Sequence, residues 1–268
     1  LIPTSVQVAK LNQLTRAGLD TASATKGQTT VFTEYGGSLI EVLRNKAKVL
    51  MLGATVLSGL QGNVSFPRQT GGATASWLGE NPGSDVAESN LTLDSVTLSP
   101  KTLQATTSYS RQLLAQNAIN VDAVVVDDLS QVNAIEVDRA ALHGTGASNQ
   151  PTGIYAASVN TVAFGGTVAF DKLVDMETEI ALDNADFDTM AYLTTPGVRG
   201  KAKKTAELAN TVNNAIWRNN EMNGYRAEVS NNISKILGAG TNEHGIILGI
   251  WSELLFGEWG AMEIITDP

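Results

Sequence analysis

The sequence has no cysteine and no long apolar run. Without a Cys among its 268 residues, disulfide bonds, thiolate metal sites and cysteine nucleophiles are all excluded. No apolar stretch approaches the 18 or more residues that a membrane-spanning helix needs, and the opening residues lack a signal-peptide pattern. We therefore expect no membrane partner. Because no Met precedes Leu1, we expect a processed or shortened product.

Charge and aromatic rings are also scarce. Charged residues make up 17% of the chain, below the usual quarter, and the formal net charge is −9. Lys and Arg are scattered, whereas a nucleic-acid-binding face needs a basic stripe. Aromatic residues, at 6%, are too few for base-stacking platforms. Low charge together with 25 Gly indicates that a partner covers much of the surface.

Catalytic motifs are absent as well. The only two histidines, His143 and His244, have no metal-ligand pattern near them. Residue counts leave a Ser–His–Asp triad open, but there is no Gly-x-Ser-x-Gly elbow. The Gly-rich segment 144–153 lacks Gly-Lys-Ser/Thr and follows a helix pattern, so we interpret it as a helix exit and turn rather than a phosphate loop. We expect no catalytic residue, metal or cofactor.

What the sequence does contain is a long predicted hairpin at 59–103. Its outgoing half alternates at Val64 and Phe66 and then meets Pro67, which suits an edge strand. The alternation of the return half changes phase near Asp94 and Ser95, which predicts a bulge or bend.

This hairpin cannot bury itself on its own molecule. About 17 residues each way, at roughly 3.3 Å per residue, would reach some 50–60 Å. A lone hairpin is marginally stable in water, so it needs a neighbouring surface. Its tip is rich in Gly, Ser and Thr but carries Trp77, and an exposed Trp on a loop suggests a partner that covers it.

Helix patterns flank the hairpin. Ser38 and Glu41 predict a capped helix over 38–52, closed by Gly53. A short helix is predicted at 110–117 and a long one at 121–143. The long helix has an apolar face of Val125, Leu129, Val132 and Ile135. Its acidic residues, which we interpret as solvated or facing a neighbour, are Asp122, Asp127, Asp128, Glu136 and Asp138.

From residue 170 the pattern becomes α/β. We expect a helix at 170–182, then a strand at 189–193 and a helix that Thr195 and Pro196 begin. Further strands are predicted at 225–229 and 245–250, and packed irregular structure at 251–260. The body of the helix after Pro196 is expected to carry a basic cluster of Arg199, Lys201, Lys203 and Lys204.

Four stretches, taken in order, resemble the major capsid proteins of tailed bacteriophages with the Hong Kong ninety-seven-type fold. They are 52–80, 141–154, 192–205, and 217–225 continuing to 249–255. The resemblance implies an α+β fold with an N-terminal arm (1–37) and an extended β-hairpin loop (56–103). It further implies a peripheral domain with a long spine helix (38–55 and 104–150) and an axial α/β domain (151–268). The family continues past a segment like 261–268, so we expect its closing strands to be missing.

The function implied is that of a shell subunit. Copies of the chain would form hexamers and pentamers of an icosahedral capsid around double-stranded DNA, with only weak nonspecific DNA contact. Portal, scaffold or maturation protease would be partners during assembly. The chain would be located in the virion, which is assembled in the bacterial cytoplasm. An encapsulin-type nanocompartment is the alternative within this class; an acidic hydrolase with a β-lid is one from another class.

We predict intersubunit contacts at two places. The candidates are Arg68, Trp77, Leu78, Glu80, Lys201, Lys203 and Lys204. Trp77 is the best single anchor, whereas a solvated helix face explains the lysines equally well. Some members of the resembled family crosslink their shell through a loop lysine, but this chain has no Lys between Lys48 and Lys101.

Overall fold

A computed structural model describes residues 42–80, 87–116, 120–157, 160–185, 189–208, 214–237 and 242–265. The chain divides into two compact units, one of Leu1–Val42 with Arg111–Val121 and one of Leu43–Ser110 with Asp122–Pro268. In the first unit the structure describes a helix, α2 (Arg111–Gln116), which confirms the helix predicted at 110–117. The predicted arm, 1–37, lies outside the described residues, and the proposed domain boundaries stay a prediction.

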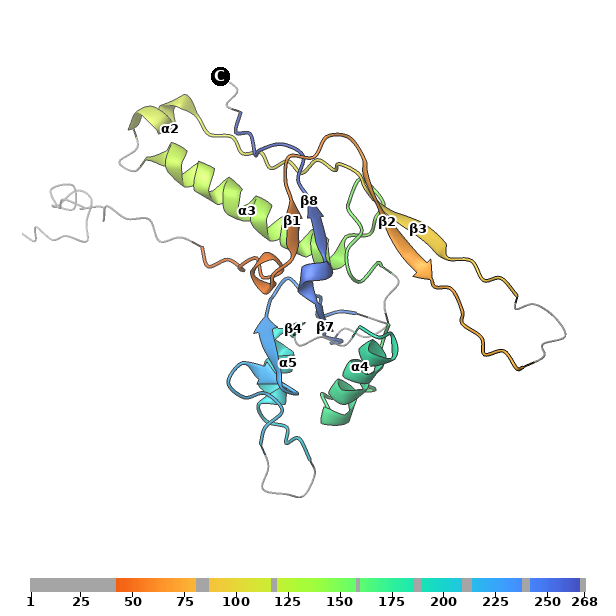
Figure 1. Ribbon diagram of the computed structural model, residues 1–268. Coiled ribbons are helices and arrows are strands. Elements are labelled where there is room, and N and C mark those ends of the chain that lie inside the picture. Colours follow the sequence, from red (N-terminus) through yellow and green to blue (C-terminus); the bar gives the residue numbers. More distant parts are fainter. Residues whose placement is uncertain are drawn as a thin grey trace, which may run out of the picture. The chain divides into compact units, whose positions relative to one another are not determined.

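The second unit contains, from Asp122 on, the long helix α3 (Val121–His143), which was predicted with these bounds (Figure 1). The amide of Gly144 donates to the Ala140 carbonyl (2.8 Å), and the chain then returns, with the Gly153 amide donating to the Gly144 carbonyl (2.8 Å). A Cβ on Gly144 or Gly153 would overlap backbone atoms, so this close approach requires glycine at both positions. The predicted helix exit and turn is confirmed.

A four-stranded sheet forms the centre of the α/β part. Its order is β5 (Glu221–Met222), β6 (Tyr225–Val229), β4 (Met190–Thr194) and β7 (Ile246–Ile250). The central strand β4 pairs parallel with β6 and antiparallel with β7. All five of its residues are buried, as expected of a strand covered on both faces. The strands predicted at 189–193, 225–229 and 245–250 are confirmed within a residue; β5 was not predicted.

A hydrophobic core lies on each face of β4. On one face Tyr192 joins residues of α4 (Phe170–Leu182) and α5 (Pro196–Ala202), both predicted as helices. This core comprises Val168, Leu173, Tyr192, Val198, Ala202, Ile216, Trp217, Met222 and Ala227. The other face joins α3 and the segment before the hairpin, through Val49, Leu142, Ala191, Leu193, Ile233 and Trp251.

Helix α5 begins as predicted but ends early. The Thr195 hydroxyl accepts from the Val198 amide (3.3 Å), and Pro196 follows at the first position. From Ala202 on, backbone carbonyls accept from residues outside the helix: the Ala202 carbonyl accepts from the Trp217 amide (3.4 Å) and the Thr205 carbonyl from the Ile216 amide (3.0 Å). The prediction that the lysines lie in the helix body is therefore wrong for Lys203, at the C-cap, and Lys204, beyond it.

The helix predicted at 38–52 is wrong in its described part. Residues 42–48 have no regular structure, and only the 3-10 turn η2 (Leu50–Leu52) forms before Gly53, whose φ of 105° closes it. The amides of Lys48 and Val49 donate to the Asp138 carboxylate oxygen Oδ1 (2.7 and 2.8 Å) instead of to carbonyls of a helical turn. The Asp138 side chain on α3 thus accepts from these two amides, so they are not available for the hydrogen bonds of a helix at 38–52.

The same contact corrects the expectation for Asp138, which we placed among solvated or neighbour-facing residues. It is only 2% exposed. Its second oxygen, Oδ2, accepts from the side-chain amide of Asn232 (2.7 Å). One carboxylate therefore joins α3 to a segment 90 residues earlier and to another 94 residues later.

The hairpin forms from β2 (Val64–Gly71) and β3 (Thr92–Leu98), which pair antiparallel as predicted (Figure 1). The bulge is not at Asp94 and Ser95, because both keep their partners in register; the register shifts between Gln69 and Gly71. The change of phase in β3 has another cause. Leu93 and Val96 fall on opposite faces of a regular strand, and both are exposed.

The base of the hairpin is attached to the end of the chain. Strand β1 (Thr55–Leu57) pairs parallel with β8 (Leu255–Gly257), which follows the short turn η3 (Trp251–Glu253). The indole N–H of Trp259 donates to the Gly62 carbonyl (2.6 Å). The segment predicted as irregular at 251–260 thus supplies a strand. No helix in the described residues is long and apolar enough to span a membrane.

Removing the Asp138 carboxylate should destabilise the fold strongly. We expect Asp138→Ala to lower the free energy of unfolding by about 3 kcal/mol, because it leaves the buried Val49 amide, the half-buried Lys48 amide and an Asn232 N–H without their acceptor. Asp138→Asn should cost less, since one oxygen remains. Urea denaturation measures both variants. The exposed Asp127→Ala on the same helix is the control, and an equal, small loss in all three would contradict the role of Asp138.

Candidate subunit interface

One face of the hairpin changes from apolar to polar toward its tip. Near the base it carries Val64, Phe66, Val96 and Leu98, and all but Val96 are half-buried. Next on this face is the pair Arg68 and Asp94, joined at 3.0 Å. Two hydrogen bonds lower the pKa of the Asp94 carboxyl. The larger effect comes from the Ser95 amide and the smaller one from Arg68. Arg68, a predicted contact residue, is therefore already paired within its own chain.

The tip exposes apolar side chains. The Trp77 side chain is fully exposed and Leu78 is 58% exposed, while Glu80 is also on the surface. A large exposed apolar surface of this kind marks an interaction site or an aggregation liability. Within the described residues β2 and β3 pair only with each other, so each keeps a free outer edge. Three of the predicted contact residues are thus exposed, and their contact with a partner stays a prediction.

The other candidates lie on and after α5. Lys201, Lys203 and Lys204 are exposed, as is Arg199 beside them. In the described part of the chain none of these four side chains forms a salt bridge. The predicted contact residues therefore form two groups on separate elements, the hairpin and α5.

An ion cluster that the sequence did not predict fixes the segment before the hairpin. Lys48 Nζ lies 3.0 Å from Glu228 Oε2 on β6, and Arg226 contacts the other oxygen of Glu228 at 2.8 Å. Burial would raise the pKa of Glu228, but the two cations outweigh it and the pKa is lowered. Arg44 also pairs with Asp128 of α3. The Arg44–Asp128 and Lys48–Glu228 pairs join residues 84 and 180 positions apart, so no local pattern could have identified them.

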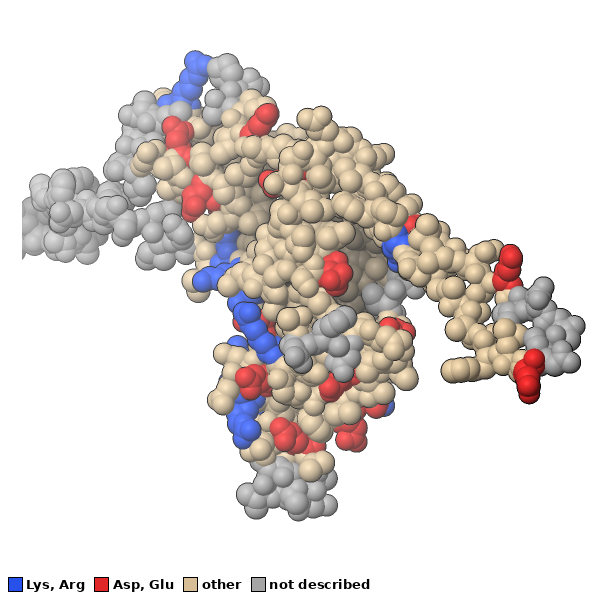
Figure 2. Space-filling view, in the orientation of Figure 1, with Lys and Arg blue, Asp and Glu red and all other residues tan. Residues whose placement is uncertain are grey.

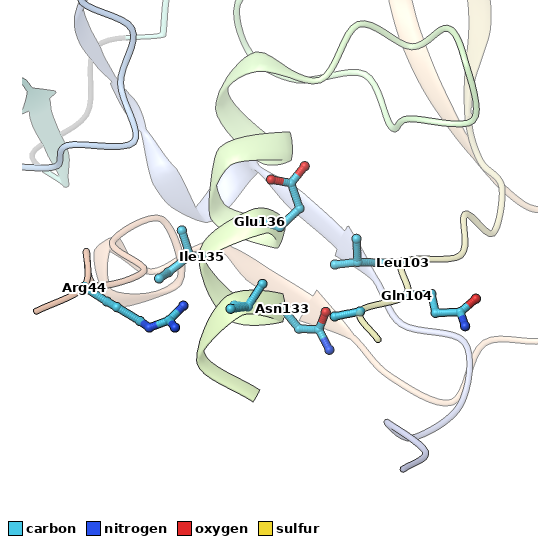
Figure 3. A pocket seen from close by; sticks show the side chains of 8 residues that line it. Arg44, Leu103, Gln104, Asn133, Ile135 and Glu136 are labelled. Carbon is cyan, nitrogen blue, oxygen red and sulfur yellow. The ribbon is translucent and has the colours of Figure 1, made fainter. Parts of the chain in front are cut away.

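A shallow pocket of about 240 Å³ lies over α3 (Figure 3). Figure 3 shows Arg44 at one side, Leu103 and Gln104 at the other, and side chains of α3 between them. Its lining consists of Arg44, Leu103, Gln104, Ala105, Val132, Asn133, Ile135 and Glu136. None of these is a nucleophile or a histidine, and the two charged ones are occupied by Asp128 and Arg139. The pocket therefore offers no arrangement for acid–base or covalent chemistry.

Both histidines make structural contacts. His143 Nε2 accepts from the Ser234 amide (2.9 Å), and its ring stacks on Tyr155 at 4.6 Å between centroids. His244 Nδ1 hydrogen-bonds the buried Thr195 hydroxyl (2.7 Å). No group of three or more His, Cys, Asp or Glu residues within the described ranges is placed to hold a metal ion.

Comparison with known proteins identifies the family. The model of the "Phage capsid family" matches residues 27–268. The chain belongs to the phage capsid family. The predicted resemblance to phage capsid proteins and the predicted α+β capsid fold are confirmed.

Two curated relatives are major capsid proteins of phages. That of Halomonas phage phiHAP-1 is 35% identical over 228 residues, which cover 85% of this chain and 36% of the relative. That of Klebsiella oxytoca phage phiKO2 is 27% identical over 235 residues, covering 84% of this chain and 54% of the relative. This family member therefore spans about a third to a half of the length of the curated relatives it matches.

Solved structures share the fold. The capsid of a native GTA particle, computed with C5 symmetry, superposes with a TM-score of 0.68 at 17% identity, covering 88% of this chain and 84% of that one. The structure from Microbacterium phage Oxtober96 gives a TM-score of 0.67 at 16% identity, with 90% and 82% covered. At identities this low, the structural likeness establishes the fold of this capsid-family chain but not its function.

The contact between His143 and Ser234 predicts a dependence of stability on pH. Burial lowers the pKa of His143 below 6.5, and the positive charge of Arg139 makes a smaller contribution in the same direction. The folded state then binds fewer protons than the unfolded state, so stability should fall as pH drops from about 6.5 through the lowered pKa. Unfolding titrations from pH 7.5 to 4.5 should show this loss, and His143→Gln, which keeps an acceptor, should show less of it. Identical curves for the two proteins would refute the assignment.

Proposed function

We propose that the chain is a structural shell subunit that assembles into hexamers and pentamers of an icosahedral phage capsid around double-stranded DNA. The observation that carries the proposal is a fully exposed Trp77 on a two-stranded hairpin in a member of the phage capsid family. A large apolar side chain in this position gains no burial within its own copy, whereas a surface of another copy would bury it.

The mechanism is assembly through a heterologous interface. A hairpin that lies across the next copy presents a different surface from the one it covers, and such interfaces close into rings. Trp77 and Leu78 supply the apolar anchor, with Glu80 close to them in the sequence, while Arg68 lies in β2 and is paired with Asp94. The hairpin contacts the rest of its own chain mainly at its base, so bending of its outer part accommodates hexamers and pentamers.

The family and the relatives favour a phage shell over an encapsulin-type compartment, because the matched proteins are phage major capsid proteins. We infer that the chain carries no catalytic residue and needs no cofactor. Portal, scaffold and maturation protease are the assembly partners that we propose, with weak nonspecific contact to packaged DNA. Assembly then takes place in the bacterial cytoplasm, and the product resides in the virion.

Truncating the tip tests the proposal. The purified chain should form rings or shells in negative-stain electron microscopy and sizing, and Trp77→Ala should weaken association by about 2 kcal/mol or more without lowering the melting temperature. Ile236→Ala, which truncates another exposed apolar side chain, is the control and should assemble normally. A wild-type chain that stays monomeric at high concentration would contradict the shell function. A melting temperature lowered by Trp77→Ala would show instead that Trp77 is a core residue.

The shell should be held together by noncovalent contacts alone. Between Lys48 and Lys101 the single basic residue is Arg68, whose guanidinium stays protonated and is a poor nucleophile. An isopeptide bond from the hairpin is therefore chemically excluded, and the lack of Cys excludes disulfides. Assembled particles boiled in detergent should give one band on a denaturing gel, at the subunit mass of 28.2 kDa or at that of a longer parent chain. A ladder of covalent multimers would disprove this inference.

A further inference from the structure

Four exposed cations on and after α5 make no salt bridge within the described residues. We call them the basic surface: Arg199, Lys201, Lys203 and Lys204. The next acidic residue in the sequence after them is Glu207, and none lies between 196 and 206. Attraction to the helix C-terminus favours one or two cations here but not four exposed ones. In a chain of net charge −9, such a concentration of unpaired positive charge indicates a partner of opposite sign.

The same chain carries a matching surface on α4. Asp171, Asp175 and Glu179 recur every four residues on the exposed side of the helix, which we call the acidic stripe. Leu173 on the opposite side of the helix is fully buried in the core. Asp175 pairs with Lys172 (2.8 Å), whereas Asp171 and Glu179 form no salt bridge in the described part of the chain. The exposed Leu182, at the end of the same helix, adds an apolar contact area.

The two surfaces belong to two helices that pack against the same core, since Leu173 of α4 and Val198 and Ala202 of α5 are all buried in it. Helix α5 starts directly after the carboxyl end of β4. Helix α4 instead reaches the turn that precedes β6, where Glu177 accepts from the Tyr225 hydroxyl (2.8 Å). Because β6 runs parallel to β4, that turn is at the amino end of β4. In Figure 2 basic side chains lie along the left side of the lower part, with an acidic one among them, and further acidic side chains lie to their right.

We propose that the acidic stripe of one copy docks on the basic surface of the next copy around each ring. This inference rests on the proposed shell function and names the surfaces that meet. Two different surfaces on one chain form a heterologous, ring-closing contact. Complementary charge of this kind selects the partner and speeds association. A polyanion such as duplex DNA is disfavoured as the occupant, because the chain as a whole is strongly negative.

Charge exchange tests the pairing. The variants are Lys201→Glu with Lys204→Glu on one surface, Asp171→Lys with Glu179→Lys on the other, and all four substitutions together. Each one-sided variant should assemble about tenfold more weakly at 0.15 M salt, because like charges then face each other. The fourfold variant should recover most of the loss, since the attraction is restored with reversed sign. Lys46→Glu with Lys235→Glu, both exposed, is the control of equal charge change and should assemble normally.

The outcomes separate this inference from the proposed function. A wild-type chain that never assembles overturns the shell proposal. A wild-type chain that assembles, with one-sided variants equal to it or a fourfold variant that is not rescued, overturns the pairing and leaves the shell proposal intact. Loss of binding to a labelled 20-base-pair duplex on reversing the basic surface, with assembly unchanged, would assign that surface to DNA instead. Melting temperatures near that of the wild type establish that the exposed substitutions leave the fold intact.

Discussion

A single buried carboxylate, that of Asp138, holds the second unit together. It accepts from the Lys48 and Val49 amides and from the Asn232 side chain, so that α3, the segment before the hairpin and the segment after β6 meet at one residue. Burying a carboxylate is unfavourable unless hydrogen bonds compensate, and here they come from groups that would otherwise lack partners themselves. Val49, fixed by this contact, contributes to the core on one face of β4. From Val49 the chain passes through η2 and through β1, which pairs with β8, before it reaches the hairpin strand β2.

The tryptophans show how the molecule divides into a fixed base and a free tip. The buried Trp251 donates its indole N–H to the Ala191 carbonyl (2.9 Å), and Trp259 donates to Gly62 at the base of the hairpin. Trp77, at the other end of the same hairpin, is fully exposed. Aromatic side chains near the base are thus used to stabilise the subunit, whereas the one at the tip contributes nothing to it. This uneven distribution is expected when the outer half of a hairpin is stabilised only in an assembly.

The elements predicted correctly from the sequence are those with local causes. Gly144 ends α3, Thr195 and Pro196 begin α5, and the alternation at Val64 and Phe66 marks β2; each signal lies within a few residues of its effect. The predicted helix at 38–52 failed because the competing acceptor, Asp138, is 90 residues away from Lys48. The candidate interface divides in the same way. An exposed Trp77 followed from its Gly-rich surroundings, but the pairing of Arg68, the ion cluster at Glu228 and the pocket over α3 each combine distant segments, and sequence spacing carries no information about them.

The two proposed contact surfaces would contribute to assembly in different ways. A buried Trp supplies affinity through apolar area, which salt hardly affects. Exposed charges such as those of α4 and α5 supply little net energy, but they orient approaching copies and are screened within about 8 Å at physiological ionic strength. A subunit with only the charged surfaces would associate fast and dissociate fast, and one with only the apolar tip would bind any apolar surface. Because the two lie on separate elements, a copy would engage both at once only when correctly placed in the proposed ring, and this geometric requirement would make assembly selective.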